Sequence, residues 1–293
     1  MNRIGDQRCE AGRQLLFTGV MPELPEVETL VRTLRPALIG KRILSADLRW
    51  KRTLAAPSPA KFKQQVCGQE IQELSRRAKF LDIHLATFHL VFHLRMSGDL
   101  LVVLGGYQPA KHDRLILKLT DDTSLVFNDA RKFGRVWLVN DPAQLFRDLG
   151  PEPLSDEFTL AWLQAALQVH HRQLKPLLLD QTFIAGLGNI YVDEALHMAK
   201  LHPLTRSDSV NMQQAQSLWA AIREVLEEGV RRNGASIDWV YRGGEFQDHF
   251  RVYGRAGQPC PVCGTKIERI LVGQRGTHFC PHCQAASNQN IVK

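Results

Sequence analysis

The sequence has few cysteines, and their distribution does not suit a disulfide framework. Four of the six form two close pairs near the C-terminal end, Cys260 with Cys263 and Cys280 with Cys283. Cysteines at regular spacings along a small secreted domain indicate disulfides, whereas close pairs are typical of metal binding in a reducing compartment. The pattern therefore favours an intracellular protein with a metal site.

Long hydrophobic runs, internal repeats and low-complexity tracts are also lacking. No stretch of about 18 consecutive apolar residues is present, so the sequence predicts no membrane span. A hydrophobic fraction of 44% over 293 residues is nevertheless enough for a substantial core, and the length allows two domains or one domain with appendages.

Acidic residues are in deficit. The chain has 37 lysines and arginines against 30 aspartates and glutamates, a formal net charge of +7. Such a balance is compatible with a polyanionic partner but does not by itself identify one.

Residues 21–28 read MPELPEVE, an unusual composition for the start of a globular core. If the chain began after Met21, Pro22 would carry a free secondary amine, and α-amino groups titrate near pH ~7.7–8.0. Such an amine can attack a sugar or carbonyl carbon to form an iminium, with Glu23 and Glu26 as adjacent proton-transfer groups. The alternative is an ordinary helix start, with Pro25 in its first turn and acids favoured by the helix dipole. The two interpretations are compatible.

Residues 1–20 would block that amine if they were retained. They contain three arginines and two acidic residues, and their one apolar run, residues 15–17, is too short for a secretory signal. We expect translation to start at Met21. Proteolytic processing and a genuine inhibitory extension are the alternatives.

Turn residues and apolar periodicity divide the rest of the chain. Helical spacing of apolar residues begins at Val27 and continues toward Gly40, with Pro36 predicting a kink or an early end. Strand-like runs follow at 42–50, 70–74, 80–85, 90–94, 100–104, 114–120, 124–128 and 134–139. After a turn-rich boundary at 149–154, helical spacing occurs at 160–169, 174–180, 190–200 and 212–232. We predict an α+β fold: an antiparallel β-sandwich or barrel, then a helical domain, then a small metal module.

The metal module is the strongest signal obtained from spacing alone. Sixteen residues separate the pairs Cys260/Cys263 and Cys280/Cys283, which predicts one structural zinc ion held by four thiolates. Residues 267–272 and 277–280 resemble two strands of a hairpin around 273–276, with Arg275 at its tip. Many such modules bind proteins, so the spacing does not establish a DNA-binding role.

The sequence resembles the formamidopyrimidine-DNA glycosylases, whose chains begin MPELPEVET as this one does from Met21. The resemblance continues to about Gln284. It implies an N-terminal antiparallel β-sandwich with an N-terminal helix, a helix–two-turns–helix domain and a C-terminal zinc hairpin. The corresponding boundaries are 1–21 for the extension with the start methionine, 22–150, 151–253 and 254–293.

Residues 184–195, IAGLGNIYVDEA, resemble the helix–two-turns–helix of this family, in which the asparagine binds backbone phosphate. Asn189 is therefore expected to be a phosphate ligand. By itself the glycine-rich segment is either a tight interhelical turn or a turn that lets backbone N–H groups approach a phosphate. Arg172 and Lys175 are candidate supporting cations or, alternatively, solvated charges of a helix face.

Other expected roles rest on matching motifs. In the family the lysine of RRAK reaches the active site, and Lys79 matches it; by itself such a basic cluster is usually surface. The side chains that replace the extruded nucleotide match Met96, Arg131 and Phe133. His112 matches a phosphate-contacting histidine. Arg275 likewise matches the hairpin arginine that contacts the phosphate next to the lesion.

The resemblance implies a bifunctional glycosylase/AP lyase that removes 8-oxoguanine and formamidopyrimidines from duplex DNA. Pro22 would attack C1′ to form a Schiff base and Glu23 would protonate the sugar ring oxygen. Lys79 and Arg275 would assist β- and then δ-elimination, while zinc is structural and no redox cofactor is required. We expect a monomeric, cytoplasmic, nucleoid-associated enzyme of base excision repair.

Three alternatives remain. An endonuclease VIII-like enzyme acting on oxidised pyrimidines is disfavoured because its chains typically open MPEGPE, whereas Leu24-Pro25 follows Glu23 here. A catalytically silent zinc-containing DNA-binding protein becomes the better interpretation if residues 1–20 persist. A zinc-hairpin module for protein interaction would leave residues 21–28 and the basic charge unexplained.

Overall fold

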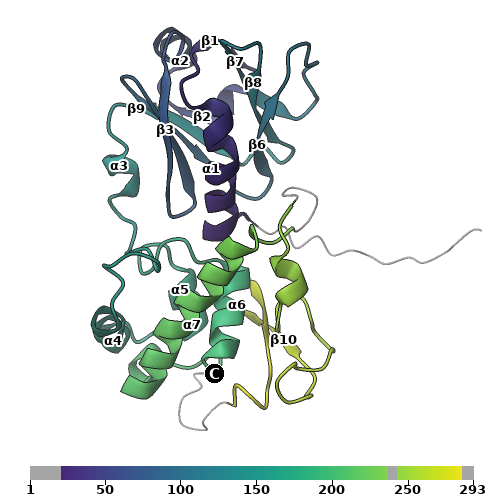
Figure 1. The fold of residues 1–293 in the computed structure, drawn as a ribbon. Coiled ribbons are helices and arrows are strands. Elements are labelled where there is room, and N and C mark those ends of the chain that lie inside the picture. Colours follow the sequence, from purple (N-terminus) through teal and green to yellow (C-terminus); the bar gives the residue numbers. More distant parts are fainter. Residues whose placement is uncertain (1–20, 237–242, 286–293) are drawn as a thin grey trace, which may run out of the picture.

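Strand-rich and helix-rich parts of the chain occupy opposite ends of the computed structural model, which describes residues 21–236 and 243–285. The strands form the upper part in Figure 1, and the helices and a C-terminal hairpin form the lower part. A single helix, α1 (Leu24–Leu38), runs between the two. Within the described ranges, no helix combines the length and the apolar character needed to cross a bilayer.

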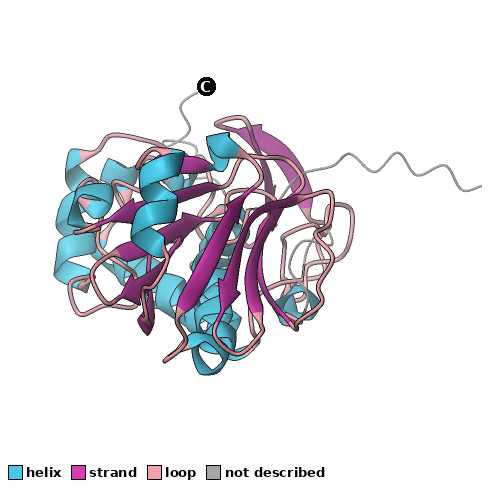
Figure 2. Cartoon of the chain, turned by 90° about the horizontal axis from the view of Figure 1, so that it is seen from above, coloured by secondary structure: helices cyan, strands magenta, loops and turns pink. Residues whose placement is uncertain are grey.

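Two sheets face each other in the upper part, as the view from above shows (Figure 2). One has the strand order β1-β7-β8-β6 and the other β2-β9-β5-β4-β3. The strands are β1 (Ile43–Leu48), β2 (Leu54–Ala56), β3 (Ile71–Arg77), β4 (Phe80–Leu85), β5 (His89–His93), β6 (Gly98–Val103), β7 (Asp113–Leu119), β8 (Ser124–Asp129) and β9 (Arg135–Val139). All pairings are antiparallel except that of the short edge strand β2 with β9. The predicted sandwich is confirmed, with one parallel pair that the sequence did not indicate.

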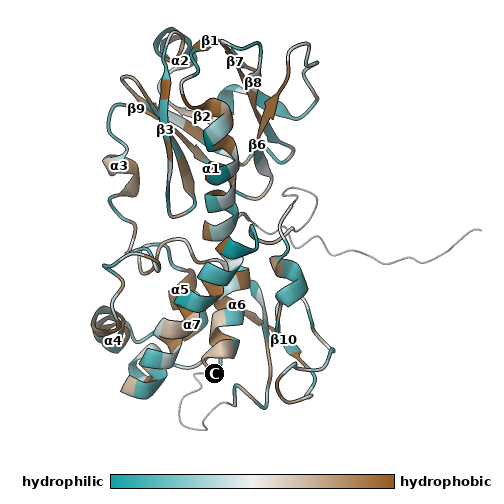
Figure 3. Ribbon diagram, viewed as in Figure 1, coloured by the Kyte–Doolittle hydropathy of each residue, from teal (hydrophilic) through white to brown (hydrophobic). Residues whose placement is uncertain are grey.

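Besides α1, the described residues form helices α2 to α7 and short 3-10 turns. The helices are α2 (Pro59–Val66), α3 (Ala143–Phe146), α4 (Leu160–Val169), α5 (Leu174–Leu179), α6 (Asn189–Met198) and α7 (Met212–Arg231), with 3-10 turns at Lys51–Thr53, Ser207–Ser209 and Phe246–His249. In Figure 3 the strands are largely brown, whereas α1 and α7 alternate between brown and teal. This alternation reflects helices with one buried and one solvated face.

Helix α1 belongs to two hydrophobic cores. Leu24 packs with the helical part, and its amide donates to the Gly186 carbonyl at 3.1 Å. The later apolar residues pack inside the sandwich: Val27, Leu30, Val31, Leu34 and Leu38. The first turn of α1 is therefore held by both parts of the molecule.

The predicted early end of α1 at Pro36 was wrong. The helix continues to Leu38, two residues past the proline. A proline within a helix removes one N–H donor, but Leu34 and Leu38 are buried in the sandwich core on either side of it. Their burial stabilises the last turn in spite of the missing hydrogen bond.

A two-stranded hairpin of β10 (Glu268–Val272) and β11 (Arg275–Phe279) ends the described chain. Gly273 and Gln274 form the turn, both with positive φ, 52° and 62°. Positive φ at both central positions is typical of the tight turns that match strand twist. Val272 pairs with Arg275, so the arginine is the first residue of the returning strand rather than part of the turn itself.

Candidate functional site

A cleft of about 1050 Å³ lies where the sandwich, the helical part and the hairpin meet. It joins residues from Met21 to His278, which are 257 positions apart in the sequence. Its lining includes Met21, Glu23, Lys79, His93, Arg95, Met96, Phe133, Gln181, Gly188, Asn189, Arg269, Arg275 and His278. Pro22 is buried between the lining residues Met21 and Glu23. The cleft thus brings together predicted site residues from six separate segments of the sequence: Glu23, Lys79, Met96, Phe133, Asn189 and Arg275.

Glu23 is held by one carboxylate oxygen and leaves the other without a protein partner. Oε1 accepts the Ile190 amide proton at 3.0 Å, whereas Oε2 has no hydrogen-bond partner within the described residues. Burial raises the pKa of Glu23 to about 7, with the nearby Lys79 charge acting in the opposite direction. At neutral pH a large fraction of Glu23 therefore carries a proton that it can donate.

The glycine-rich turn before α6 has a different role from the one considered above. A Cβ on Gly188 would lie 2.2 Å from the Glu23 carboxyl carbon, so only glycine leaves room for that side chain. The Glu23 carboxylate accepts the Ile190 N–H at the helix start. That N–H group is not free for a phosphate, and the turn positions a carboxyl group instead.

Glu26 lies behind the cleft and fixes the first turn of α1. Its Oε1 accepts the Tyr191 hydroxyl at 2.7 Å and the Ala235 amide at 2.8 Å, and its Oε2 accepts the Glu23 amide at 2.9 Å. Burial raises the pKa of Glu26. With both oxygens engaged, Glu26 is suited to positioning Glu23 and not to exchanging protons with a substrate.

The basic cluster before β4 separates into two kinds of residue. Arg76 pairs with Glu28 at 3.1 Å and with Glu152 at 2.9 Å, and Arg77 pairs with Glu152 at 3.2 Å. Lys79 instead lines the cleft and is 5% exposed. The two arginines are thus held in ion pairs away from the cleft, and Lys79 is the residue of this cluster that reaches the site.

The Lys79 ammonium is in an environment that favours its neutral form. Burial lowers the pKa of Lys79, and the charges of Arg275 and Arg95 lower it further, while Glu23 and Glu26 raise it. A lysine that loses its proton more easily than usual can act as a base or proton carrier.

His93 also lines the cleft and was not found from the sequence. Its Nδ1 accepts the Arg95 amide at 3.1 Å, and burial lowers the pKa of His93 to about 3. The imidazole is therefore neutral, and its remaining proton is on Nε2. His93 offers the cleft an uncharged N–H donor.

Two loops bring the predicted void-filling residues together. Arg131 Nη1 lies 3.7 Å from Met96 Sδ, and the Arg131 guanidinium lies 6.0 Å from the Phe133 ring centre. Phe133 is 52% exposed, which is unusual for a large aromatic side chain and leaves it free to insert between bases. The buried Asp129 accepts the Ser97 hydroxyl and the Gly134 amide, at 2.7 Å for the latter, and so joins the two loops.

The hairpin is fixed to one face of α6. Asn189 Nδ2 donates to the Gly276 carbonyl at 3.0 Å, and the His278 amide donates to Asp193 Oδ2 at 2.9 Å. Lys175 is fully buried and pairs with the other oxygen of Asp193. Lys175 is therefore neither a solvated helix charge nor a cleft residue. It is the counter-ion of the carboxylate that holds the hairpin.

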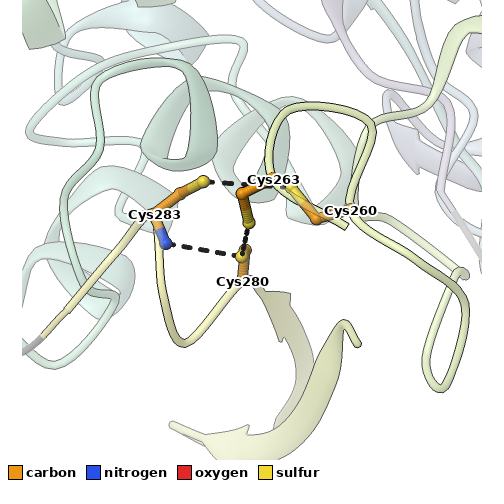
Figure 4. Close-up of side chains that lie close together, drawn as sticks. All are labelled: Cys260, Cys263, Cys280 and Cys283. Atoms are coloured by element: carbon orange, nitrogen blue, oxygen red, sulfur yellow. Dashed lines mark hydrogen bonds between the residues drawn. The ribbon is translucent and has the colours of Figure 1, made fainter. Parts of the chain in front are cut away.

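Four cysteine sulfurs at the end of α6 form a metal-binding geometry (Figure 4). The four Sγ atoms lie within 4.8 Å of one another, with 3.9 Å between Cys260 and Cys283 and 3.5 Å between Cys263 and Cys280. Tetrahedral zinc with Zn–S bonds of about 2.3 Å requires S···S distances of about 3.8 Å. The arrangement fits zinc. His197 Nε2 lies 3.4 Å from Cys260 Sγ, a second contact of α6 with this module.

Three of the predicted DNA-binding residues do not line the cleft. Arg131 contacts Met96, which does line it. Arg172 pairs with Asp180 at 2.7 Å. His112 Nδ1 lies 3.3 Å from Arg114 Nη2 in the loop before β7. Neither side chain belongs to the set that lines the cleft. A DNA contact from either would lie outside the catalytic centre.

Five contributors to the site were missed from the sequence: His93, Arg95, Tyr191, Asp193 and Arg269. Asp193 and Tyr191 stand within the segment that resembles the helix–two-turns–helix. Asp193 follows Asn189 by four residues and shares its helix face, whereas Tyr191 lies on the opposite side, so the spacing could have indicated contacts with different elements. The other three carry no local signal, because only the folded chain places them in the same cleft as Glu23 and Lys79.

Comparison with family models divides the chain into three matches. Residues 21–136 match the N-terminal domain of formamidopyrimidine-DNA glycosylase, residues 149–240 match its H2TH domain, and residues 257–286 match a zinc finger found in FPG and IleRS. The zinc-finger match spans all four cysteines, which hold one structural zinc ion.

Individual relatives match most of the chain. A formamidopyrimidine-DNA glycosylase of Chloroflexus aggregans is 47% identical, covering 90% of this chain and 98% of that protein, and one of Pelotomaculum thermopropionicum is 41% identical, covering 90% and 99%. The structure is similar to that of Lactococcus lactis Fpg complexed with abasic-site DNA. The TM-score is 0.86 and the identity 37%, over 90% of this chain and 100% of that one. Another Lactococcus lactis Fpg complex contains N7-benzyl-Fapy-dG DNA, with the same coverage and TM-score.

Proposed function

The chain belongs to the formamidopyrimidine-DNA glycosylase family, and from that premise we propose how its cleft performs the reaction. The protein is a base-excision-repair glycosylase and AP lyase that acts on damaged bases in DNA. We propose that its preferred lesions are 8-oxoguanine and formamidopyrimidines in duplex DNA. We also propose that it works as a monomer in the cytoplasm, associated with the nucleoid, with the domain boundaries expected above.

Pro22 is the nucleophile in this proposal. Its nitrogen attacks C1′ of the damaged nucleotide while the bond from C1′ to the base breaks and the base leaves with a proton. The attack requires a free amine, so the active chain begins at Pro22. The cleft supports this role because Pro22 lies between two of its lining residues.

Glu23 is the acid that opens the sugar. It donates its proton to the ring oxygen as the C1′–O bond breaks and the Pro22 nitrogen forms an iminium with C1′. The observation that carries this proposal is the asymmetric anchoring of the carboxyl group: Oε1 is held by Ile190, and Oε2 is buried with no hydrogen-bond partner among residues 21–236 and 243–285. A pKa of Glu23 near 7, caused by burial, supplies the proton at neutral pH.

Lys79 and Arg275 assist the elimination steps. The iminium acidifies the C2′ proton, and its removal expels the 3′ phosphate by β-elimination; a second elimination expels the 5′ phosphate. Lys79 is suited to accept or deliver protons because its pKa is lowered by burial. Arg275 lines the same cleft and would neutralise the charge of the phosphate group as it leaves.

Positioning of the DNA is assigned to the remaining predicted residues. Met96, Arg131 and Phe133 would fill the space left by the extruded nucleotide, since their two loops are joined through Asp129. Asn189, His112 and Arg172 would contact backbone phosphates. The zinc ion stabilises the hairpin and takes no part in the chemistry.

Borohydride trapping on a duplex containing 8-oxoguanine tests the proposal. The protein would be prepared in two forms, one starting at Met1 and one at Met21, and the intact mass of each recorded. We expect a covalent adduct only from the form whose terminus is Pro22, because borohydride reduces the iminium to a stable amine.

Other outcomes would change the assignment. An adduct formed while residues 1–20 are still attached would identify a different amine, with Lys79 the first candidate. Binding without an adduct from either form would contradict the catalytic proposal and favour a silent DNA-binding protein.

A further inference from the structure

Arg95 is a charged residue in a backbone conformation that suits glycine. It follows His93 in the loop between β5 and β6 and has a φ of 55°. Left-handed backbone is costly for residues with a Cβ atom, and such residues concentrate at functional sites. The backbone amide of Arg95 donates to His93 Nδ1 at 3.1 Å. This hydrogen bond holds the backbone conformation and does not involve the Arg95 side chain.

The Arg95 side chain lines the cleft and makes no hydrogen bond or ion pair with any residue in 21–236 or 243–285. Its position is close to the reacting centre. The Arg95 charge lowers the pKa of both His93 and Lys79, in each case after the larger effect of burial. Arginines elsewhere in the sandwich, such as Arg76 and Arg77, are paired with carboxylates.

The Arg95 guanidinium and the Lys79 ammonium are like charges that face the same cleft, and an anionic ligand bound there would offset their repulsion. The DNA backbone supplies such an anion, and arginine recognises phosphate oxygens through its planar set of donors. Arg95 immediately precedes Met96, the residue that enters the duplex where the nucleotide is extruded. The phosphates within reach are those next to that nucleotide.

We propose that Arg95 binds a backbone phosphate flanking the extruded nucleotide, as a DNA-binding residue additional to Arg275 and Asn189. The inference rests on the proposed function. It assigns to the sandwich side of the cleft a phosphate contact that complements the one expected from the hairpin, so that the damaged strand is held from both sides of the reacting sugar.

Substitution of Arg95 by glycine separates the effect of the guanidinium from the effect of the loop conformation. Glycine adopts positive φ readily, so R95G removes the guanidinium without disturbing the loop, and the melting temperature should stay close to that of the wild type. R95K keeps the charge and serves as the conservative variant. Lys61 on α2, an exposed residue at the far end of the sandwich (Figure 1), provides the charge-matched control K61A.

The measurement is the affinity of the full chain for a duplex with a tetrahydrofuran abasic analogue, between 50 and 200 mM salt. Each phosphate contact contributes about −0.9 to the slope of log K against log salt. R95G should reduce the magnitude of that slope by about 0.9, the value for one phosphate contact. Between 50 and 200 mM salt, the factor by which affinity falls should then be about 3-fold smaller for R95G than for the wild type. K61A should keep the wild-type slope, and R95K should restore most of it.

Failure of the proposed function and failure of the Arg95 phosphate contact would give different results. Wild-type protein that does not bind the analogue would refute the proposed function. Wild-type binding with an unchanged slope in R95G would refute only the phosphate contact. A shifted pH optimum for strand cleavage with an unchanged slope would also refute it, and would assign Arg95 to tuning Lys79.

Discussion

Two buried carboxyl groups, Asp193 on α6 and Glu23 at the N-terminal end of α6, differ in how completely the protein satisfies their hydrogen bonds. At the hairpin, Asp193 uses both oxygens, one for Lys175 and one for His278. In the cleft, Glu23 uses one oxygen and leaves the other without a partner within the described residues. A fully paired buried charge contributes to a unique structure, whereas an incompletely paired one is available for chemistry.

The neighbouring residues extend the contrast. Beside Asp193, Glu194 accepts the amides of Arg251, Val252 and Tyr253, at 2.8, 3.0 and 2.8 Å, and so holds the approach to the zinc module. The cleft instead contains cations, Lys79, Arg95 and Arg275, that form no ion pair with a carboxylate in the part of the chain that the structure describes. One helix therefore supplies a satisfied face for assembly and an N-terminal end that holds the acid of the reaction.

The largest effect is expected from Glu23→Gln. Glutamine can still accept the Ile190 amide proton but cannot donate a proton to the sugar oxygen, so strand cleavage should fall by roughly 10²–10⁴-fold. Single-turnover assays on 8-oxoguanine duplex measure the loss, and affinity for the abasic analogue serves as the control. Retention of more than a tenth of the activity would contradict the assignment.

The same variant should change the pH dependence of stability. The pKa of Glu23 is about 7 in the folded protein against 4.5 for the unfolded chain, so the folded state binds the proton more tightly between these values. This contribution to the free energy of unfolding is present below pH 4.5 and is lost as the pH rises to 7. Glutamine does not titrate. As the pH rises across that window, the free energy of unfolding of E23Q should therefore increase relative to that of the wild type by up to about 3 kcal/mol. Urea unfolding at pH 5 and pH 8 measures the difference.

Asp193→Asn should be the most destabilising change on the satisfied face. It leaves the Lys175 charge buried without its partner, and breaking such a pair typically costs about 3–5 kcal/mol. The pKa of Lys175 is already lowered by burial. The loss of stability in D193N should therefore become smaller as the pH rises and Lys175 loses its proton.

A double variant provides the control for that prediction. Lys175→Met in the D193N background removes the unpaired charge, and the asparagine oxygen can still accept the His278 amide. Most of the lost stability should return. Equal unfolding midpoints for D193N and the double variant would show that Lys175 was not the cause.

Unlike Asp193→Asn, Arg275→Ala should weaken DNA binding and leave stability almost unchanged, because the Arg275 side chain has no hydrogen-bond or ion-pair partner in the described ranges. The free energy of unfolding should change by less than about 0.5 kcal/mol. DNA binding should weaken for all sequences, with the salt slope reduced by about one phosphate contact. An unchanged slope, measured with the same abasic-analogue duplex, would refute the phosphate contact.

The smallest effect is expected from His197→Phe, a change at the far end of the satisfied face. Phenylalanine fills a similar volume but cannot donate to the Cys260 sulfur 3.4 Å away. Loss of a hydrogen bond to a metal ligand typically weakens metal binding by about 10-fold or more. Zinc release to a chromogenic chelator should accelerate while the far-ultraviolet circular dichroism is unchanged. A wild-type release rate would show that the contact does not support the metal.

Much of the fold follows from local pattern. Helix α4 has the bounds 160–169 that its apolar spacing predicted, and the other long helices differ by one or two residues at their ends. The elements that were missed, β2, α2 and α3, are short, and short segments carry too few periods to stand out. Pro36 does not end α1 early, because Leu34 and Leu38 are buried on either side of it, and a local rule cannot weigh that burial.

Short segments of the sequence establish which chemical groups are available: a proline and two glutamates after a methionine, four thiolates at zinc spacing, and basic motifs that resemble those of a glycosylase family. These features can be recognised locally, since each occupies a short stretch of the chain. Which of the charges are paired depends instead on the packing of distant elements. Lys175 and Lys79 both follow basic or turn-rich segments, but one is paired inside the helical core and the other is placed in the cleft. Burial and distance set the proton affinity of Glu23 and the accessibility of Arg95, and both quantities depend on elements that are distant in the chain.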